Sequence, residues 1–146
     1  KIDYNQPIVL MSTHCRAIDA DTNFAYYGEP VAFIGKQELF NIPIFGTCCI
    51  ECGNIPIERA QREQSVNALK NAAMQCKRDK KTVGIFPEGT RRRRPSTGDA
   101  SQLLPFKKGG FYMARDADAI IIPAVHIGCS RLIDGLLPEW GRLSSN

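Results

Sequence analysis

The chain has 146 residues, of which 43% are hydrophobic and 23% charged, a composition that excludes a disordered or fibrous protein. A chain of this length buries roughly two thirds of its unfolded surface, so it needs no disulfide staples, and we expect one domain over residues 1–146. The formal charge of +4 is modest, but basic residues gather within residues 77–81 and 91–94. This clustering predicts a local anion site or an anionic surface as a partner, and no nucleic acid is expected.

The first predicted element is a strand at residues 8–12, a continuously apolar run of the kind that parallel sheets bury on both faces. It leads directly to His14. A second strand is predicted at residues 31–34. The hydrophobic stretch that follows, up to residue 53, is interrupted by Pro43 and Gly46 and predicts no single element.

A helix is predicted from residue 61 to about residue 77, because apolar side chains recur there at steps of three and four. The side chains expected to face the core are Val66, Leu69, Ala73 and Cys76. Basic residues at the end of the segment suit the negative end of a helix dipole. The pattern therefore predicts one buried helix face.

Two further strands are predicted at residues 82–86 and 119–122, the second ending at Pro123, with a short helix at residues 108–115 between them. Strands that alternate with helices predict an α/β fold with a largely parallel central sheet flanked by helices. Such sheets bind ligands beyond the carboxyl ends of their strands. We therefore expect His14, Glu88 and Pro123 to lie in that crevice.

His14 and Asp19 are the first candidate catalytic residues. A carboxylate beside a histidine fixes one imidazole tautomer and stabilises the imidazolium that forms when the ring accepts a proton. Positions five apart on one helix lie about 140° apart around its axis, so the side chains meet if His14 precedes a helix and Asp19 sits in its first turn. The pair is a candidate general base. The alternative is a helix-capping aspartate near a turn histidine.

The string Phe-Pro-Glu-Gly-Thr-Arg at residues 86–91 follows a buried strand and presents a carboxylate, a glycine and a guanidinium in one tight turn. Glycine lets the backbone approach a ligand closely, and arginine binds phosphate through a planar fork of donors. The candidate phosphate-binding residues are thus Glu88, Gly89, Thr90 and Arg91. A β-turn with a solvated charge cluster is the alternative.

Arg59 and Lys107 are single cations that could complete the same anion pocket. Arg59 ends an alternating segment, and Lys107 follows a Pro-Phe pair. Single charges at a protein surface are commonly solvated and contribute little, so both interpretations stay open at this point.

Six cysteines are present, and we interpret them as reduced thiols because an α/β core of this size needs no bridges. Cys49 and Cys52 form one CxxC pair, but no second pair or adjacent histidine completes a zinc set. No metal ion is expected. A thiol-redox function for this pair is a remote alternative.

Four segments, taken in order, resemble the blocks of the glycerophospholipid acyltransferases, most nearly the branch that acylates lysophosphatidate. The segments are residues 12–19, with His14 and Asp19; Gly-Asn-Ile-Pro-Ile-Glu-Arg at 53–59; Phe-Pro-Glu-Gly-Thr-Arg at 86–91; and Ile-Ile-Pro-Ala-Val at 121–125. The third is the most specific. The resemblance covers nearly the whole chain and implies an α/β acyltransferase domain, with a membrane-anchoring segment expected before it.

The resemblance implies a direct acyl transfer without a cofactor, in which acyl-CoA or an acyl carrier protein is the thioester donor. His14 would deprotonate the hydroxyl of a lysophospholipid acceptor, and Asp19 would orient the imidazole. Arg59 and Arg91 would hold the phosphate of the acceptor, with Lys107 as a helper and the 88–90 turn shaping the site. Pro123 would shape the acyl side of the cleft.

The resemblance also implies a membrane-associated protein whose active site faces a reducing, cytosolic or stromal, side. Thr13, Arg16, Glu58 and Arg92 stand where the family often has asparagine, serine, aspartate and serine. Arg92 bears on acceptor preference, and Thr13 and Arg16 are the departures that a silent lipid-binding module would explain. The alternatives are a glycerol-3-phosphate or other lysophospholipid acyltransferase, and a catalytically silent lipid-binding module of the same fold.

Overall fold

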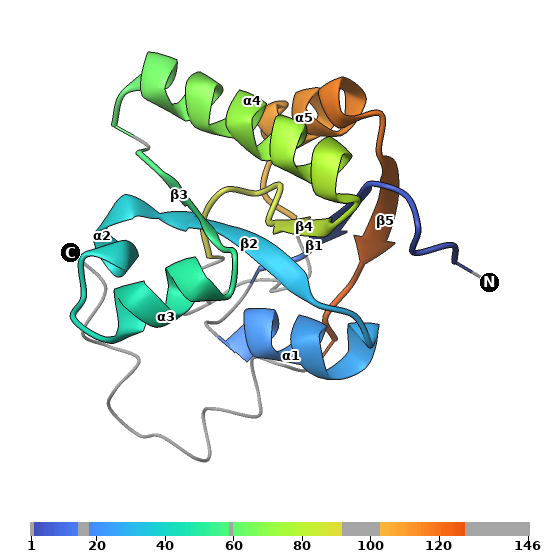
Figure 1. The fold of residues 1–146 in the computed structure, drawn as a ribbon, viewed down its shortest axis with the longest axis horizontal. Helices are drawn as coiled ribbons and strands as arrows, with labels where there is room; N and C mark the ends of the chain where they lie inside the picture. The colour runs from blue at the N-terminus through green and yellow to red at the C-terminus, as the bar shows by residue number, and fades with distance from the viewer. Residues whose placement is uncertain (1, 15–17, 59, 92–102, 128–146) are drawn as a thin grey trace.

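The fold is seen in a computed structural model that describes residues 2–14, 18–58, 60–91 and 103–127. Its centre is a sheet of five parallel strands in the order β3-β2-β4-β1-β5 (Figure 1). The strands are β1 (Ile8–Ser12), β2 (Val31–Lys36), β3 (Ile55–Ile57), β4 (Thr82–Ile85) and β5 (Ile120–Ala124). The predicted parallel sheet is confirmed.

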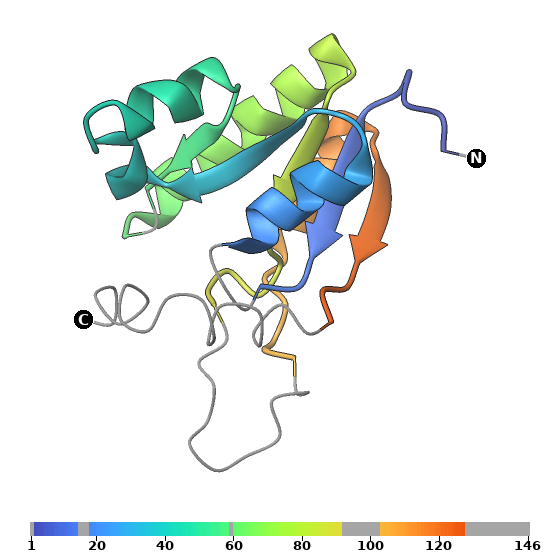
Figure 2. The same ribbon diagram turned by 90° about the horizontal axis from the view of Figure 1, so that it is seen from below.

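Helices cover both faces of this sheet, as the two perpendicular views show (Figures 1 and 2). The helices are α1 (Ile18–Tyr27), α2 (Gln37–Phe40), α3 (Phe45–Glu51), α4 (Arg62–Asp79) and α5 (Gly109–Ala117). Helices α4 and α5 pack side by side on one face, and α1 lies on the other. The short helices α2 and α3 lie near the β2–β3 edge. The predicted α/β class, with helices flanking the sheet, is therefore confirmed.

Burial on both faces of the sheet explains why the first four residues of β1 are apolar. Its five residues are all buried, because Val9 and Met11 pack toward α4 and α5 while Leu10 packs into the cluster beneath α1. An alternating pattern, with one polar face, would leave one helix layer without apolar contacts. Burial on both faces thus holds β1 between the two helix layers, and this sets where the residues that follow it emerge.

The strand register brings three chain segments to one edge of the sheet. Met11 is paired with Ile85 of β4 on one side and with Pro123 of β5 on the other. The residues that follow these strands therefore emerge together, at 13–14, 86–91 and 125–127. This edge is where a parallel sheet places its ligand crevice.

Two predictions need correction. Val66 does not face the core but is 43% exposed, because the side chains that α4 buries completely lie in its second half, at Ala72, Ala73 and Cys76. Pro123 does not end its strand but lies inside β5. A proline is tolerated there because β5 is an edge strand of the described sheet, where one backbone N–H can be absent without breaking a ladder.

The stretch from Gln37 to Glu51, for which the sequence predicted no element, holds α2 and α3 in a tight pair. A Cβ added at Gly46 would lie 2.0 Å from the carbonyl oxygen of Phe40, so only glycine permits this approach.

None of the described helices has the length and apolarity of a membrane span. Among the described cysteines, Cys48, Cys49, Cys52 and Cys76 are free thiols.

Candidate active site

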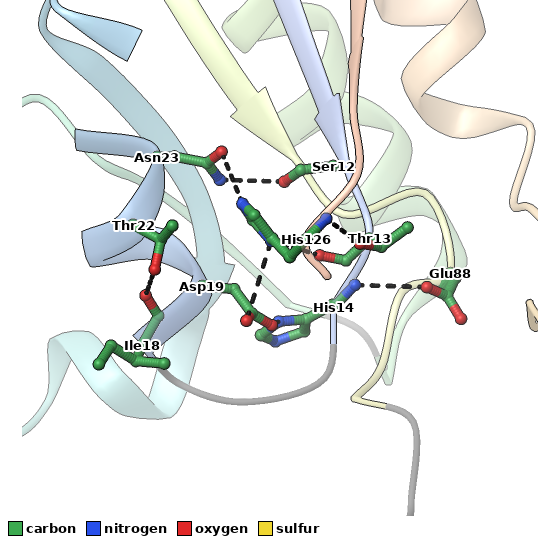
Figure 3. A network of polar contacts seen from close by, with 9 residues as sticks. All are labelled: Ser12, Thr13, His14, Ile18, Asp19, Thr22, Asn23, Glu88 and His126. Carbon is green, nitrogen blue, oxygen red and sulfur yellow. Dashed lines mark hydrogen bonds and ion pairs between the residues drawn. The ribbon is translucent and has the colours of Figure 1, made fainter. Parts of the chain in front are cut away.

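His14 and Asp19 meet at the carboxyl edge of the sheet (Figure 3). The Nδ1 atom of His14 lies 3.0 Å from Oδ2 of Asp19. His14 follows β1, and Asp19 is the second residue of α1, so the pair has the strand-end and first-turn arrangement that its spacing predicts. The Asp19 side chain is fully buried, and that of His14 is 17% exposed. One partner is thus anchored and the other is reachable from solvent.

The chemistry of this pair follows from which nitrogen faces the carboxylate. With Asp19 on Nδ1, the Nε2 atom of a neutral His14 is the nitrogen left to accept a proton. The buried carboxylate then stabilises the imidazolium that forms, and the positive end of the α1 dipole favours the negative charge of Asp19 in its first turn. Such an arrangement can act as a general base with its orienting carboxylate.

A stack of aromatic rings holds the imidazole from its face. The ring of His14 lies parallel to that of Phe86, and Phe86 in turn stacks on Phe33 of β2, at 5.6 Å between centroids. Phe86 comes directly after β4 and packs into the cluster under α1. Asp19 therefore restrains His14 through one ring nitrogen, and Phe86 restrains the plane of the ring.

Glu88 connects the ends of β1 and β4 to the segment before α5. Its Oε1 accepts a hydrogen bond from the backbone N–H of His14 at 3.3 Å, and its Oε2 accepts one from the backbone N–H of Leu104 at 3.0 Å. The side chain is buried. Of the residues predicted to surround a phosphate, Glu88 thus has the geometry of a brace that shapes the turn.

Gly89 and Lys107 form the exposed side of the same turn. Gly89 has a φ of +70°, and a Cβ added there would lie 2.7 Å from both Cδ and Cε of Lys107. The backbone N–H of Lys107 donates to the carbonyl oxygen of Pro87 at 2.8 Å. The lysine side chain therefore lies across the bare glycine. Thr90 and Arg91 follow in exposed positions, while Arg59 lies outside the described residues.

His126 is a functional candidate that the sequence interpretation missed. Its Nε2 lies 3.1 Å from Oδ1 of Asn23, and its Nδ1 lies 3.1 Å from the carbonyl oxygen of Thr13 (Figure 3). The same Nδ1 lies 3.8 Å from Oδ1 of Asp19. A signal was present, since His126 follows β5 closely, as His14 follows β1, and neighbouring parallel strands end at one edge.

A cavity of about 480 Å³ opens beside this network, between α1 and β5. Apolar side chains dominate its lining, among them Leu10, Ile122 and Val125, while Asn23 and His126 contribute its polar wall. Pro123, predicted to shape an acyl cleft, does not line this cavity: the lining residues of β5 are its neighbours Ile122 and Ala124, and successive side chains of a strand point to opposite faces. A largely apolar pocket with a few polar groups suits an amphiphilic ligand.

The described residues contain no group of three or more histidine, cysteine, aspartate or glutamate side chains placed to hold a metal ion. The thiols of Cys48 and Cys52 are exposed on α3 and at its end, on the β2–β3 side of the sheet. The network of His14, Asp19 and His126 lies on the other side of the sheet, at the ends of β1 and β5 and beside α1.

Comparison with known proteins gives a family and a set of relatives. The sequence profile of the family described as Acyltransferase matches residues 1–127. The chain is 30% identical over 135 residues to the 1-acyl-sn-glycerol-3-phosphate acyltransferase of Escherichia coli, a match that covers 88% of this chain. It is 26% identical over 136 residues to the Saccharomyces cerevisiae protein of that name, covering 93% of this chain.

A human relative, 1-acyl-sn-glycerol-3-phosphate acyltransferase beta, is 31% identical over 121 residues and covers 83% of this chain. The chain spans about half the length of these relatives, at 53%, 43% and 41% for the bacterial, yeast and human proteins. No solved structure gives a significant match.

Proposed function

The chain belongs to the Acyltransferase family, and on that premise we propose that it forms the catalytic domain of an O-acyltransferase that acylates 1-acylglycerol-3-phosphate to give phosphatidate. The observation that carries the proposal is the 3.0 Å contact between Nδ1 of His14 and the buried carboxylate of Asp19. Relatives named as 1-acyl-sn-glycerol-3-phosphate acyltransferases support the choice of acceptor. The donor is acyl-CoA or an acyl carrier protein.

In the proposed reaction, His14 acts at the acceptor hydroxyl. Its Nε2 removes the hydroxyl proton while the oxygen attacks the carbonyl carbon of the thioester, which forms the new ester bond. The carbon–sulfur bond breaks, and the leaving thiolate takes from the imidazolium the proton that the acceptor hydroxyl gave up. A thiol has a pKa near 8.5, so this leaving group needs no strong acid. Asp19 stabilises the imidazolium between these two steps.

The acceptor phosphate is held by the basic side chains around the 86–91 turn. Lys107 lies across Gly89, and Arg91 follows in the same turn, so both cations can reach an anion that approaches the bare backbone of Gly89. Thr90 offers a hydroxyl beside them, and Arg59 is proposed as a further ligand. Glu88 keeps the turn in place from behind.

The acyl chain is assigned to the apolar cavity between α1 and β5, which Ile122 and Ala124 line on either side of Pro123 in the strand. Because both acceptor and product are lipids, the protein is proposed to work at a membrane surface. The free thiols among the described cysteines are consistent with an active site on a reducing side of that membrane. No cofactor takes part in the proposed reaction.

The test is acceptor competition with the full-length protein in lipid vesicles. With a long-chain acyl-CoA, release of free thiol is expected with lysophosphatidate and to a much smaller extent with glycerol-3-phosphate or an uncharged monoacylglycerol. A preference for glycerol-3-phosphate, or for another lysophospholipid, would keep the acyltransferase and replace the acceptor. Lipid binding without thiol release would identify the catalytically silent module instead.

A further inference from the structure

His126 is held in one orientation by three contacts. Its backbone N–H donates to Oγ1 of Thr13 at 3.0 Å, and its two ring nitrogens face the Thr13 carbonyl oxygen and Oδ1 of Asn23, each at 3.1 Å. Asn23 is itself fixed, because its Nδ2 donates to Oγ of Ser12 at 3.0 Å. The side chain of His126 is only 8% exposed. The ring therefore keeps its position relative to α1 and to the end of β1.

This orientation places the Asp19 carboxylate between two imidazoles. Oδ2 of Asp19 contacts Nδ1 of His14 at 3.0 Å, and Oδ1 lies 3.8 Å from Nδ1 of His126, which is ion-pair distance. Both ring nitrogens of His126 face oxygen atoms that accept hydrogen bonds, a setting that accommodates the doubly protonated ring. One buried carboxylate thus serves two groups that can each become cationic (Figure 3).

We propose that His126 is a positioning residue of the proposed active site, and that its protonation weakens His14 as a base because both imidazoles draw on the same Asp19 carboxylate. The proposal rests on the proposed function for its catalytic meaning, but the coupling itself is a property of the resting protein. Two like charges that share one counter-ion oppose each other, so the first proton bound makes the second harder to bind.

The titratable groups around this pair come from each element packed against it. Among the described residues, α1 contributes Asp19 together with Tyr26 and Tyr27, which line the same cavity as His126. The end of β1 contributes His14, and the 86–91 turn contributes Glu88, which contacts the backbone of His14. Asp19 is the one of these whose carboxylate lies within ion-pair distance of both histidine rings.

The chain contains two histidines, so side-chain NMR of histidine-labelled protein reports His14 and His126 alone. The experiment is a pH titration of the wild type, His126→Gln, His14→Gln and Asp19→Asn, each checked for folding by circular dichroism. The titration midpoint of His14 is expected to rise by about 0.5 pH unit in His126→Gln, as expected when a like charge is removed across a shared carboxylate. His126 should rise in His14→Gln only as far as the two rings bind protons over the same pH range, because the histidine that is protonated first meets a neutral partner.

Asp19→Asn should lower the titration midpoints of both histidines, because each imidazolium then lacks the negative charge that stabilises it. Ile121→Ala is the control on β5, the strand before His126, at an exposed side chain that does not line the cavity, and should move neither midpoint. The proposal is overturned if His126→Gln and His14→Gln each leave the remaining histidine unshifted. These titrations use no substrate, so they stand or fall independently of the proposed acyl transfer.

Discussion

The imidazole of His14 lies parallel to the ring of Phe86, with 3.8 Å between centroids and 16° between planes. Phe86 is the first residue of the Phe-Pro-Glu-Gly-Thr-Arg string, so this contact joins the candidate base to the turn that carries the candidate phosphate ligands. The orientation of His14 thus depends on the end of β4 as well as on Asp19.

Replacing Phe86 with leucine removes the ring that restrains the plane of His14. A stacked pair contributes about 0.5–1.5 kcal/mol beyond its buried area, so a fall in kcat of roughly twofold to tenfold is expected with KM for the acceptor little changed. Steady-state kinetics measure both. Phe24→Leu is the matched control, because Phe24 contacts Phe33 edge-on and does not stack on His14. Equal losses in the two variants would contradict a specific role for the stack.

Glu88→Gln tests the brace between three chain segments. Glutamine keeps the shape but has one acceptor oxygen, so one of the two backbone N–H groups, of His14 or Leu104, loses its partner. The free energy of unfolding should fall by about 1–3 kcal/mol, measured by urea denaturation. Glu29→Gln, at an exposed position, is the control. If both variants unfold at the same urea concentration as the wild type, Glu88 does not brace the site.

Gly89→Ala introduces a methyl group where the Lys107 side chain lies. Because Cδ and Cε of Lys107 must move away, KM for lysophosphatidate should rise several-fold while kcat changes little, as expected when binding common to ground and transition states is removed. Gly28→Ala is a matched control, since Gly28 also has a positive φ of +82° but no atom lies within 4 Å of its added Cβ. Both variants should lose stability, but Gly89→Ala alone should weaken acceptor binding. An unchanged KM would remove Lys107 from the phosphate site.

Cys76 should be the least reactive of the described thiols. Burial raises the pKa of its thiol, so the thiolate that reacts with alkylating agents is scarce near neutral pH. Cys48 and Cys52 are exposed. Brief treatment with iodoacetamide followed by peptide mass spectrometry should find these two modified and Cys76 protected until denaturant is added. Modification of Cys76 at the rate of Cys48 in folded protein would contradict its burial between α4 and β1.

The parts of the fold that could be predicted from the sequence are those where one physical rule acts alone. Mostly apolar runs identified β1 and β4, because strands covered on both faces bury nearly all of their side chains. Helix periodicity identified α4, but not the exposure of Val66, since periodicity defines a face and not how far the covering layer extends. The helices α2 and α3 are too short to show a period.

The residues of the candidate site could likewise be predicted where local geometry decides their position, and not where the tertiary fold does. The strand predicted before His14 and the five-residue spacing allowed His14 and Asp19 to meet, and the two side chains do meet, because a strand end and a first helical turn are local geometry. His126 lies 107 residues beyond Asp19 in the chain, and its place depends on β5 pairing with β1. The sequence shows that His126 follows an apolar strand, but that this strand pairs with β1 follows only from the tertiary fold. The inward direction of Glu88 likewise depends on the Leu104 backbone reaching it.

The central claim is that His14 is the base of an acyl transfer, and the most direct measurement is thiol release from a long-chain acyl-CoA in the presence of lysophosphatidate. The full-length protein and its His14→Ala variant are compared in the same lipid vesicles, with folding checked by circular dichroism. The account predicts acceptor-dependent release that falls by about 10²–10⁴-fold in the variant. Release that persists at the wild-type rate in a folded His14→Ala protein would contradict it.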